Sequence, residues 1–79
     1  MAIAGLLIHS TEKKLKEVEK TVKGMPEMTT YGIHRKQYVV AVAEASQEEL
    51  EESLESIRGI PGVLAVKTTF LTKEDDSVV

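Results

Sequence analysis

The sequence has 79 residues, and this length allows one small domain with a thin hydrophobic core. Its net charge of −3 argues against a general nucleic-acid-binding role, because such proteins need a basic surface that displaces counterions from phosphates. The absence of cysteine excludes disulfides, thiolate metal sites and a cysteine nucleophile. No apolar run is long enough to span a bilayer and no secretory leader pattern follows Met1, so we expect a cytoplasmic location without stable membrane insertion.

The first half of the chain predicts a strand, a helix and two further strands. Residues 2–9 form a short apolar run that is typical of a buried strand. Ser10 or Thr11 then offers a side-chain cap for a helix that runs to about Lys23. The apolar face of this helix consists of Leu15, Val18 and Val22. Two strands, residues 28–34 and 37–44, are joined by the polar turn His34, Arg35 and Lys36.

The second half predicts a second helix and a last strand. Ser46 and Glu49 form a capping box at the start of a helix over residues 47–58. Its apolar face consists of Leu50, Leu54 and Ile57. Residues 63–71 read as the last strand. The domain therefore occupies residues 1–72, and we expect residues 73–79 to form a frayed acidic tail.

The two halves of the chain resemble each other. Gly24 and Pro26 recur 35 residues later as Gly59 and Pro61, and the same offset of 35 residues takes Leu15 to Leu50. One βαβ unit is thus used twice, which is typical of the ferredoxin-like βαββαβ arrangement. We therefore predict an α+β fold with a four-stranded antiparallel sheet, strands 1 and 3 at its centre, and two helices on one face.

In such a fold the other face of the sheet is open. Alternation along each strand separates the side chains into an inner and an outer set. The set placed toward the helices is Leu6, Ile8, Tyr38, Val40, Val42, Leu64, Val66, Thr68 and Phe70. The candidate binding residues on the open face are Gly5, Leu7, His9, Tyr31, Ile33, Val39, Ala41, Ala65, Lys67 and Thr69. An apolar sheet face of this kind predicts an interaction site. The alternative is that two sheets pair through this face in a homodimer. A shift of one residue in the register of a strand would exchange its inner and outer sets.

Groups that would support catalysis are not found in a recognisable pattern. His9 and His34 are the only histidines, and their surroundings in the sequence do not supply a zinc-binding cluster. The glycines form neither a P-loop nor a dinucleotide fingerprint. We therefore expect no catalytic residue, no metal and no cofactor, and a protein that is not an enzyme. The lysines of the first helix and the glutamates of the second helix are interpreted as solvated surface residues. Alternatively, the acidic second helix attracts a cationic ligand.

Three segments form a recognisable combination: residues 5–9, residues 39–44 and, above all, residues 57–66, which contain Arg58 and the run Gly-Val-Leu-Ala-Val. Together they resemble the NapD family over about residues 3–72. The resemblance implies a cytoplasmic chaperone that binds the twin-arginine signal peptide of the periplasmic nitrate reductase catalytic subunit and delays its export until the cofactor is inserted. It further implies that the peptide lies as a helix on the open sheet face. We expect such a chaperone to be a monomer or a weak dimer.

Two other functions fit the same order of elements. A ligand-sensing regulatory module of the ACT type would act as a dimer with a small molecule at the interface, but such modules are usually attached to a second domain. An enzyme of the acylphosphatase type would need a phosphate-cradling loop and an arginine after the first strand, where this chain has Ser10, Thr11 and Glu12. Signal-peptide binding is therefore the leading hypothesis, and the sensing module is the alternative.

Overall fold

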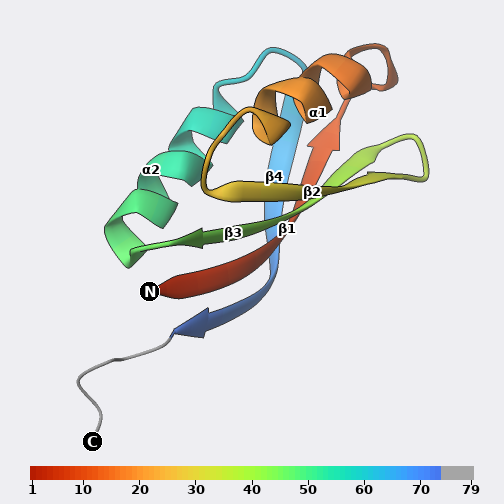
Figure 1. Cartoon of the computed structure of the whole chain (residues 1–79). Coiled ribbons are helices and arrows are strands. Elements are labelled where there is room, and N and C mark those ends of the chain that lie inside the picture. Colours follow the sequence, from red (N-terminus) through yellow and green to blue (C-terminus); the bar gives the residue numbers. More distant parts are fainter. Residues whose placement is uncertain (74–79) are drawn as a thin grey trace, which may run out of the picture.

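The computed structural model describes residues 1–73, and these form one antiparallel sheet covered on one face by two helices (Figure 1). The elements in chain order are β1 (Ala2–Ser10), the 3₁₀ turn η1 (Glu12–Lys14), α1 (Leu15–Lys23), β2 (Met28–His34), β3 (Tyr38–Ala45), α2 (Gln47–Arg58) and β4 (Val63–Lys73). The strand order is β2-β3-β1-β4, with β1 and β3 at the centre. The predicted ferredoxin-like α+β fold is therefore confirmed.

The first helix begins later than expected. Thr11 makes no side-chain cap, and the Ser10 hydroxyl instead donates to the Thr11 carbonyl at 2.9 Å. The Thr11 amide donates to the Gly62 carbonyl at 3.0 Å, which ties the end of β1 to the start of β4. A 3₁₀ turn follows, and α1 proper starts at Leu15. The prediction of a side-chain N-cap at Ser10 or Thr11 is therefore wrong.

The second helix has the predicted boundaries. The Ser46 hydroxyl accepts a hydrogen bond from the Glu49 amide at 3.2 Å, which satisfies one of the free amides of the first turn. Leu50 and Ile57 are buried against the sheet, and Leu54 is half-buried at the edge of the core. The apolar spacing thus identified the packed face of α2.

The internal repeat is visible in the way both helices end. Gly24 and Gly59 are the C-caps, and the amide after each, in Met25 and Ile60, donates to the carbonyl three residues earlier at 3.0 Å. Each connection then leads directly into a strand. The repeated sequence therefore corresponds to a repeated helix-to-strand turn.

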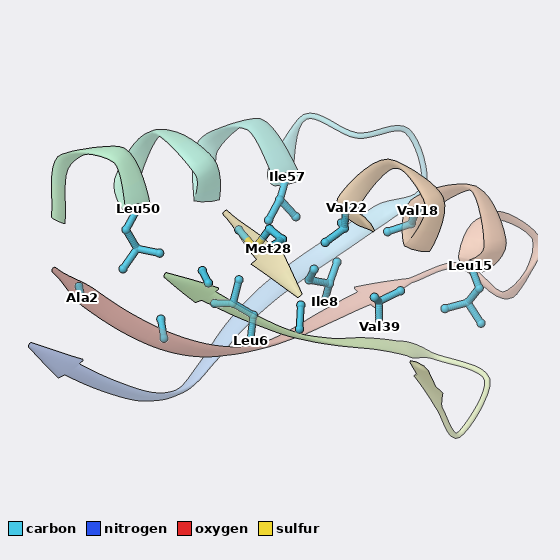
Figure 2. Close-up of a cluster of buried hydrophobic side chains, with 13 residues drawn as sticks. Ala2, Leu6, Ile8, Leu15, Val18, Val22, Met28, Val39, Leu50 and Ile57 are labelled. Atoms are coloured by element: carbon cyan, nitrogen blue, oxygen red, sulfur yellow. The ribbon is translucent and has the colours of Figure 1, made fainter. Parts of the chain in front are cut away.

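The hydrophobic core lies between the sheet and the two helices (Figure 2). The helices contribute Leu15, Val18 and Val22 from α1 and Leu50 and Ile57 from α2. The sheet contributes Ala2, Ala4, Leu6 and Ile8 from β1, Met28 from β2, and Val39, Ala41 and Ala43 from β3. Four of these seven core residues of β1 and β3 are alanines.

The register of β3 against β1 reverses one prediction. Ile8 pairs with Val39 and Leu6 pairs with Ala41, and all four side chains are buried beneath the helices. Residues opposite each other in a sheet point to the same face. Val39 and Ala41 therefore belong to the core, and the assignment of both to the open face was wrong by one residue. The alternate set, Tyr38, Val40 and Val42, which we placed inside, lies on the open face.

Irregularities in the two edge strands reverse further assignments. The β2–β3 register shifts between Thr30 and Ile33, around Gly32 with φ of +102°, so that Ile33 pairs with Val39 and follows the core side. In β4, register shifts beside His9 and Gly5 leave Leu64 60% exposed and Phe70 48% exposed, although both were expected in the core. Bulges of this kind add one residue to a strand and invert the alternation beyond it.

The last strand continues to Lys73, two residues further than the sequence predicted. The frayed acidic tail was predicted over residues 73–79. Lys73 belongs to β4 instead, and residues 74–79 lie outside the described residues. Between β2 and β3 the predicted turn is confirmed: the Gln37 amide donates to the His34 carbonyl at 3.1 Å. Arg35 and Lys36 in this turn have φ of 54° and 56°, which matches the positive φ that tight hairpin turns need.

Candidate functional site: the open face of the sheet

Strand pairing arranges the side chains of the open face in four rows across the sheet. The open face is defined here as the side away from the helices. From the start of β1 to its end, the rows are Glu44, Ile3 and Thr72; Thr29, Val42, Gly5 and Phe70; Tyr31, Val40, Leu7 and Lys67; and His34, Tyr38, His9 and Ala65. Tyr31 is placed in its row by alternation from Thr29. No helix of the described chain covers these rows (Figures 1 and 2).

The middle of the open face is apolar. Ile3, Leu7, Val40 and Val42 are half-buried by their neighbours within the sheet, and Phe70 is 48% exposed. We call these five residues the apolar strip. A solvated sheet face normally carries polar side chains, so a strip of this kind indicates a surface that another apolar group covers.

Phe70 lies over Gly5 in the second row. A Cβ on Gly5 would collide with the edge of the Phe70 ring and with the Thr69 hydroxyl. The glycine therefore permits the aromatic ring to rest on the backbone of the central strand. The register shift between Gly5 and Leu6 brings Phe70 to this position and leaves Thr69 as the additional residue of the bulge.

An aromatic pair occupies the end of the open face near the β2–β3 turn. The rings of His9 and Tyr38 are stacked, with centroids 4.9 Å apart and planes 29° apart. Both side chains are half-buried, and the exposed Tyr31 lies in the adjacent row. Aromatic side chains with a polar edge suit contact with a helix or peptide whose backbone groups are partly solvated.

Charge on the open face is sparse and separated. Glu44 is the one acidic residue in the four strands, and Lys67 lies two rows away beside Leu7. Both are exposed, and neither side chain forms a hydrogen bond or ion pair with another residue in the described range 1–73. The apolar strip is therefore bordered by an available carboxylate at one end and a cation on the other side.

The structure brings together most of the predicted binding residues, but not all. Gly5, Leu7, His9, Ala65 and Lys67 lie on the open face by their pairing. Tyr31 shares that side and the Thr69 hydroxyl adjoins Gly5, whereas Ile33, Val39 and Ala41 lie on the core side. None of these placements tests whether the residues contact a peptide, so their role stays a prediction.

Nine residues of the open-face rows are missing from the predicted set. Five are apolar or aromatic, namely Ile3, Tyr38, Val40, Val42 and Phe70, and four are polar, namely Thr29, His34, Glu44 and Thr72. For β3 the sequence held a signal, because Glu44, Val42 and Val40 are alternate residues of the strand and therefore point to the same face. A carboxylate at the end of a strand favours the solvent side, and this would have identified the correct set. No comparable signal marks Phe70, since its position depends on the β4 bulge.

The outer surface of α2 is acidic but offers no comparable site. It borders an open hollow of about 830 Å³ that is lined by Glu48, Glu51, Glu52, Leu54, Glu55, Ser56 and Arg58. Nearby, the buried Ser53 hydroxyl donates to the Glu27 carboxylate, which joins α2 to the connection between α1 and β2. Among the described residues, no group of three or more histidine, aspartate or glutamate side chains is placed to hold a metal ion.

Solved structures with this fold include a chaperone and a transcriptional regulatory protein. The chain matches the solution structure of the E. coli Tat proofreading chaperone protein NapD with a TM-score of 0.79 and 19% identity, covering 98% of this chain and 82% of that one. A hypothetical protein from Pyrococcus horikoshii matches with a TM-score of 0.81 and 22% identity, covering 96% and 94%. A transcriptional regulatory protein of the AsnC family from Pyrococcus furiosus matches with a TM-score of 0.77 and 16% identity over 96% of this chain and 52% of that one. Identities this low establish the shared fold alone.

A match between the sequence and a family model shows the family to which the chain belongs. Residues 1–75 match the model of the family described as NapD protein. The chain belongs to the NapD family. Membership supports a chaperone role, in agreement with the resemblance noted in residues 57–66. Among curated proteins, no relative matches this member of the NapD family.

The described part of this NapD-family chain contains no helix that is long and apolar enough to cross a membrane.

Proposed function

We propose that the protein binds the twin-arginine signal peptide of a periplasmic nitrate reductase catalytic subunit in the cytoplasm and delays its export until the cofactor is inserted. It acts by binding and not by catalysis. The observation that carries the proposal is the apolar strip on an uncovered sheet face, in a chain whose family supports a chaperone role.

The physical basis is the removal of apolar surface from water. A signal peptide carries a short apolar segment, which is insoluble unless it is covered. A helical segment that lies on Leu7, Val40 and Phe70 would bury apolar area on both partners, at about 25 cal/mol for each Å². Part of this free energy offsets the conformational entropy that the peptide loses when it becomes ordered, so we expect moderate affinity. Moderate affinity suits a chaperone that must later release its client.

A titration of isotope-labelled protein with a twin-arginine peptide tests the proposal. Amide shifts are expected on β1, β3 and β4 at the rows of the apolar strip, with the residues of the outer surfaces of α1 and α2 unchanged. Leu7→Glu and Val40→Glu should each weaken binding at least tenfold, because the new carboxylate must be desolvated beneath an apolar helix. Ser56→Glu, on the exposed side of α2, adds the same charge away from the open face and serves as the control.

Two outcomes would contradict the proposal. Absence of shifts at high micromolar peptide would remove its basis. Dimerisation of the free protein through the open face, with shifts produced by a small amino acid and not by the peptide, would support the ACT-type sensing module instead. The shared fold with the AsnC-family regulator is compatible with either function, because one fold supports many functions.

A further inference from the structure

The open face has a charge polarity that the proposed function does not by itself explain. Glu44 lies in the first row, where β3 ends and β1 begins. At the opposite end of the sheet, the turn between β2 and β3 carries His34, Arg35 and Lys36, all exposed, and Lys67 lies in the third row. Among the side chains of the four rows and the turn, the one carboxylate therefore lies at the first row, and the cationic groups lie toward the other end of the apolar strip.

Resting on the proposed function, we propose that this polarity sets the direction in which the signal peptide lies on the sheet. The arginine pair of the peptide contacts Glu44, and its apolar segment runs along β1 toward the aromatic pair of His9 and Tyr38. The partner is thus a segment in which a cationic end precedes an apolar helix.

Glu44 is suited to receive a guanidinium group. Its side chain is exposed and forms no bond within the described residues, so no internal partner has to be displaced. The flanking residues Ala43 and Ala45 point into the core, which directs the Glu44 side chain to the open face. A carboxylate can accept two parallel hydrogen bonds from one arginine, which specifies orientation as well as attraction.

The basic end of the sheet disfavours the reverse direction. Arginines placed there would lie near Lys67, Arg35 and Lys36, and like charges repel. The C-terminal end of a bound helix, by contrast, presents free carbonyl groups with partial negative charge, which cations stabilise. Both ends of the peptide therefore favour the same direction.

The length of the open face agrees with a short helix. From Ile3 to His9 the central strand advances about 20 Å, at about 3.3 Å per residue. A helix rises 1.5 Å per residue, so about 13 helical residues cover this length. An arginine pair next to such a helix reaches Glu44 only when the two ends are in the proposed order.

Paramagnetic labels on a synthetic peptide test the direction. The peptide carries Arg-Arg followed by about 13 leucine and alanine residues, with a nitroxide at either end. A label at the arginine end should broaden the amide signals of Ile3 and Glu44, and a label at the other end those of His9 and Tyr38. The opposite pattern would overturn the inferred direction while leaving peptide binding intact. Absence of binding by this peptide and by the native signal sequence would count against the proposed function itself.

Charge variants test the role of Glu44 separately. Glu44→Gln should weaken binding of the Arg-Arg peptide about two- to fivefold, as expected for one exposed ion pair, and leave a Gln-Gln peptide unaffected. Glu52→Gln on α2 removes the same charge from the helix-covered side and is the matched control. Equal losses of affinity for the Arg-Arg peptide in both variants would show that the peptide is attracted by the net negative charge of the protein, and would overturn the assignment of Glu44.

Discussion

Ile8 and Val39 lie opposite each other on the two central strands, and neither side chain is exposed to solvent. This pairing determines which residues of β3 form the core and which form the open face. Because Val39 points to the helices, Val40 must point away from them, beside Leu7. The binding surface that we propose depends directly on this register.

Truncation of the two neighbouring valines should therefore have different effects. Val39→Ala removes two methyl groups from a fully buried site and should lower the free energy of unfolding by about 2 kcal/mol. Val40→Ala, on the half-buried open face, should lower it by about 1 kcal/mol or less, but should weaken peptide binding. Urea denaturation and peptide titration of both variants check this. A larger stability loss for Val40→Ala would contradict the register.

Two glycines with nearly equal φ allow the cost of backbone strain to be separated from the cost of side-chain crowding. Gly32 has φ of +102° with no atom within 4 Å of an added Cβ, whereas Gly62 has φ of +98° and its added Cβ would collide with the Lys14 side chain. Gly32→Ala should cost about 1 kcal/mol from backbone strain alone. Gly62→Ala should cost more, because the contact between the α2–β4 connection and Lys14 of η1 must also open. Thermal unfolding of the two variants measures the difference, and equal losses would argue against the crowding at Lys14.

The two helix starts should respond differently to loss of a hydroxyl. Ser46→Ala removes the acceptor of the Glu49 amide and should cost about 1 kcal/mol. Thr11→Ala removes a side chain that makes no cap hydrogen bond and should cost about 0.5 kcal/mol or less. Denaturant midpoints of the pair provide the measurement. A loss for Thr11→Ala as large as that for Ser46→Ala would mean that Thr11 caps the helix in solution.

The contact between Gly5 and Phe70 should appear as an energetic coupling. Gly5→Ala forces the Phe70 ring off the central strand and should destabilise the protein by about 1–3 kcal/mol. In a Phe70→Ala background the same change should cost clearly less, with the Thr69 hydroxyl as the remaining obstacle. A double-mutant cycle by urea denaturation measures this coupling. Additive losses would show that the ring does not rest on Gly5.

Much of the fold was predictable because local and periodic signals agree. The spacing of Leu15, Val18 and Val22 identified the buried face of α1, and the Ser46 cap located the start of α2. The repeated Gly and Pro residues indicated two βαβ units and hence the order of the strands in the sheet. These signals are carried by neighbours in the chain, so the sequence alone contains them.

The site was predicted less well, because its residues depend on pairing between distant segments. Both alternating sets of β3 are apolar, and we placed the larger valines inside, whereas the core holds Val39 with the smaller Ala41 and Ala43. Bulges at Gly32 and beside Gly5 then moved Ile33 to the core side and Phe70 to the open face. A change of one residue in register exchanges the faces of a strand, and no local preference detects it.

The sequence by itself thus determined the elements, their order, the family and the presence of an uncovered sheet face. Only the tertiary structure decided which side chains β3, and the parts of β2 and β4 beyond their bulges, contribute to that face. It placed Glu44 and Val40 on the same surface as Leu7 and Lys67, and this gives the surface a direction. The physical reason is that hydrogen-bond register is set by contacts across the whole sheet, where helix packing and bulges outweigh the preferences of any single strand.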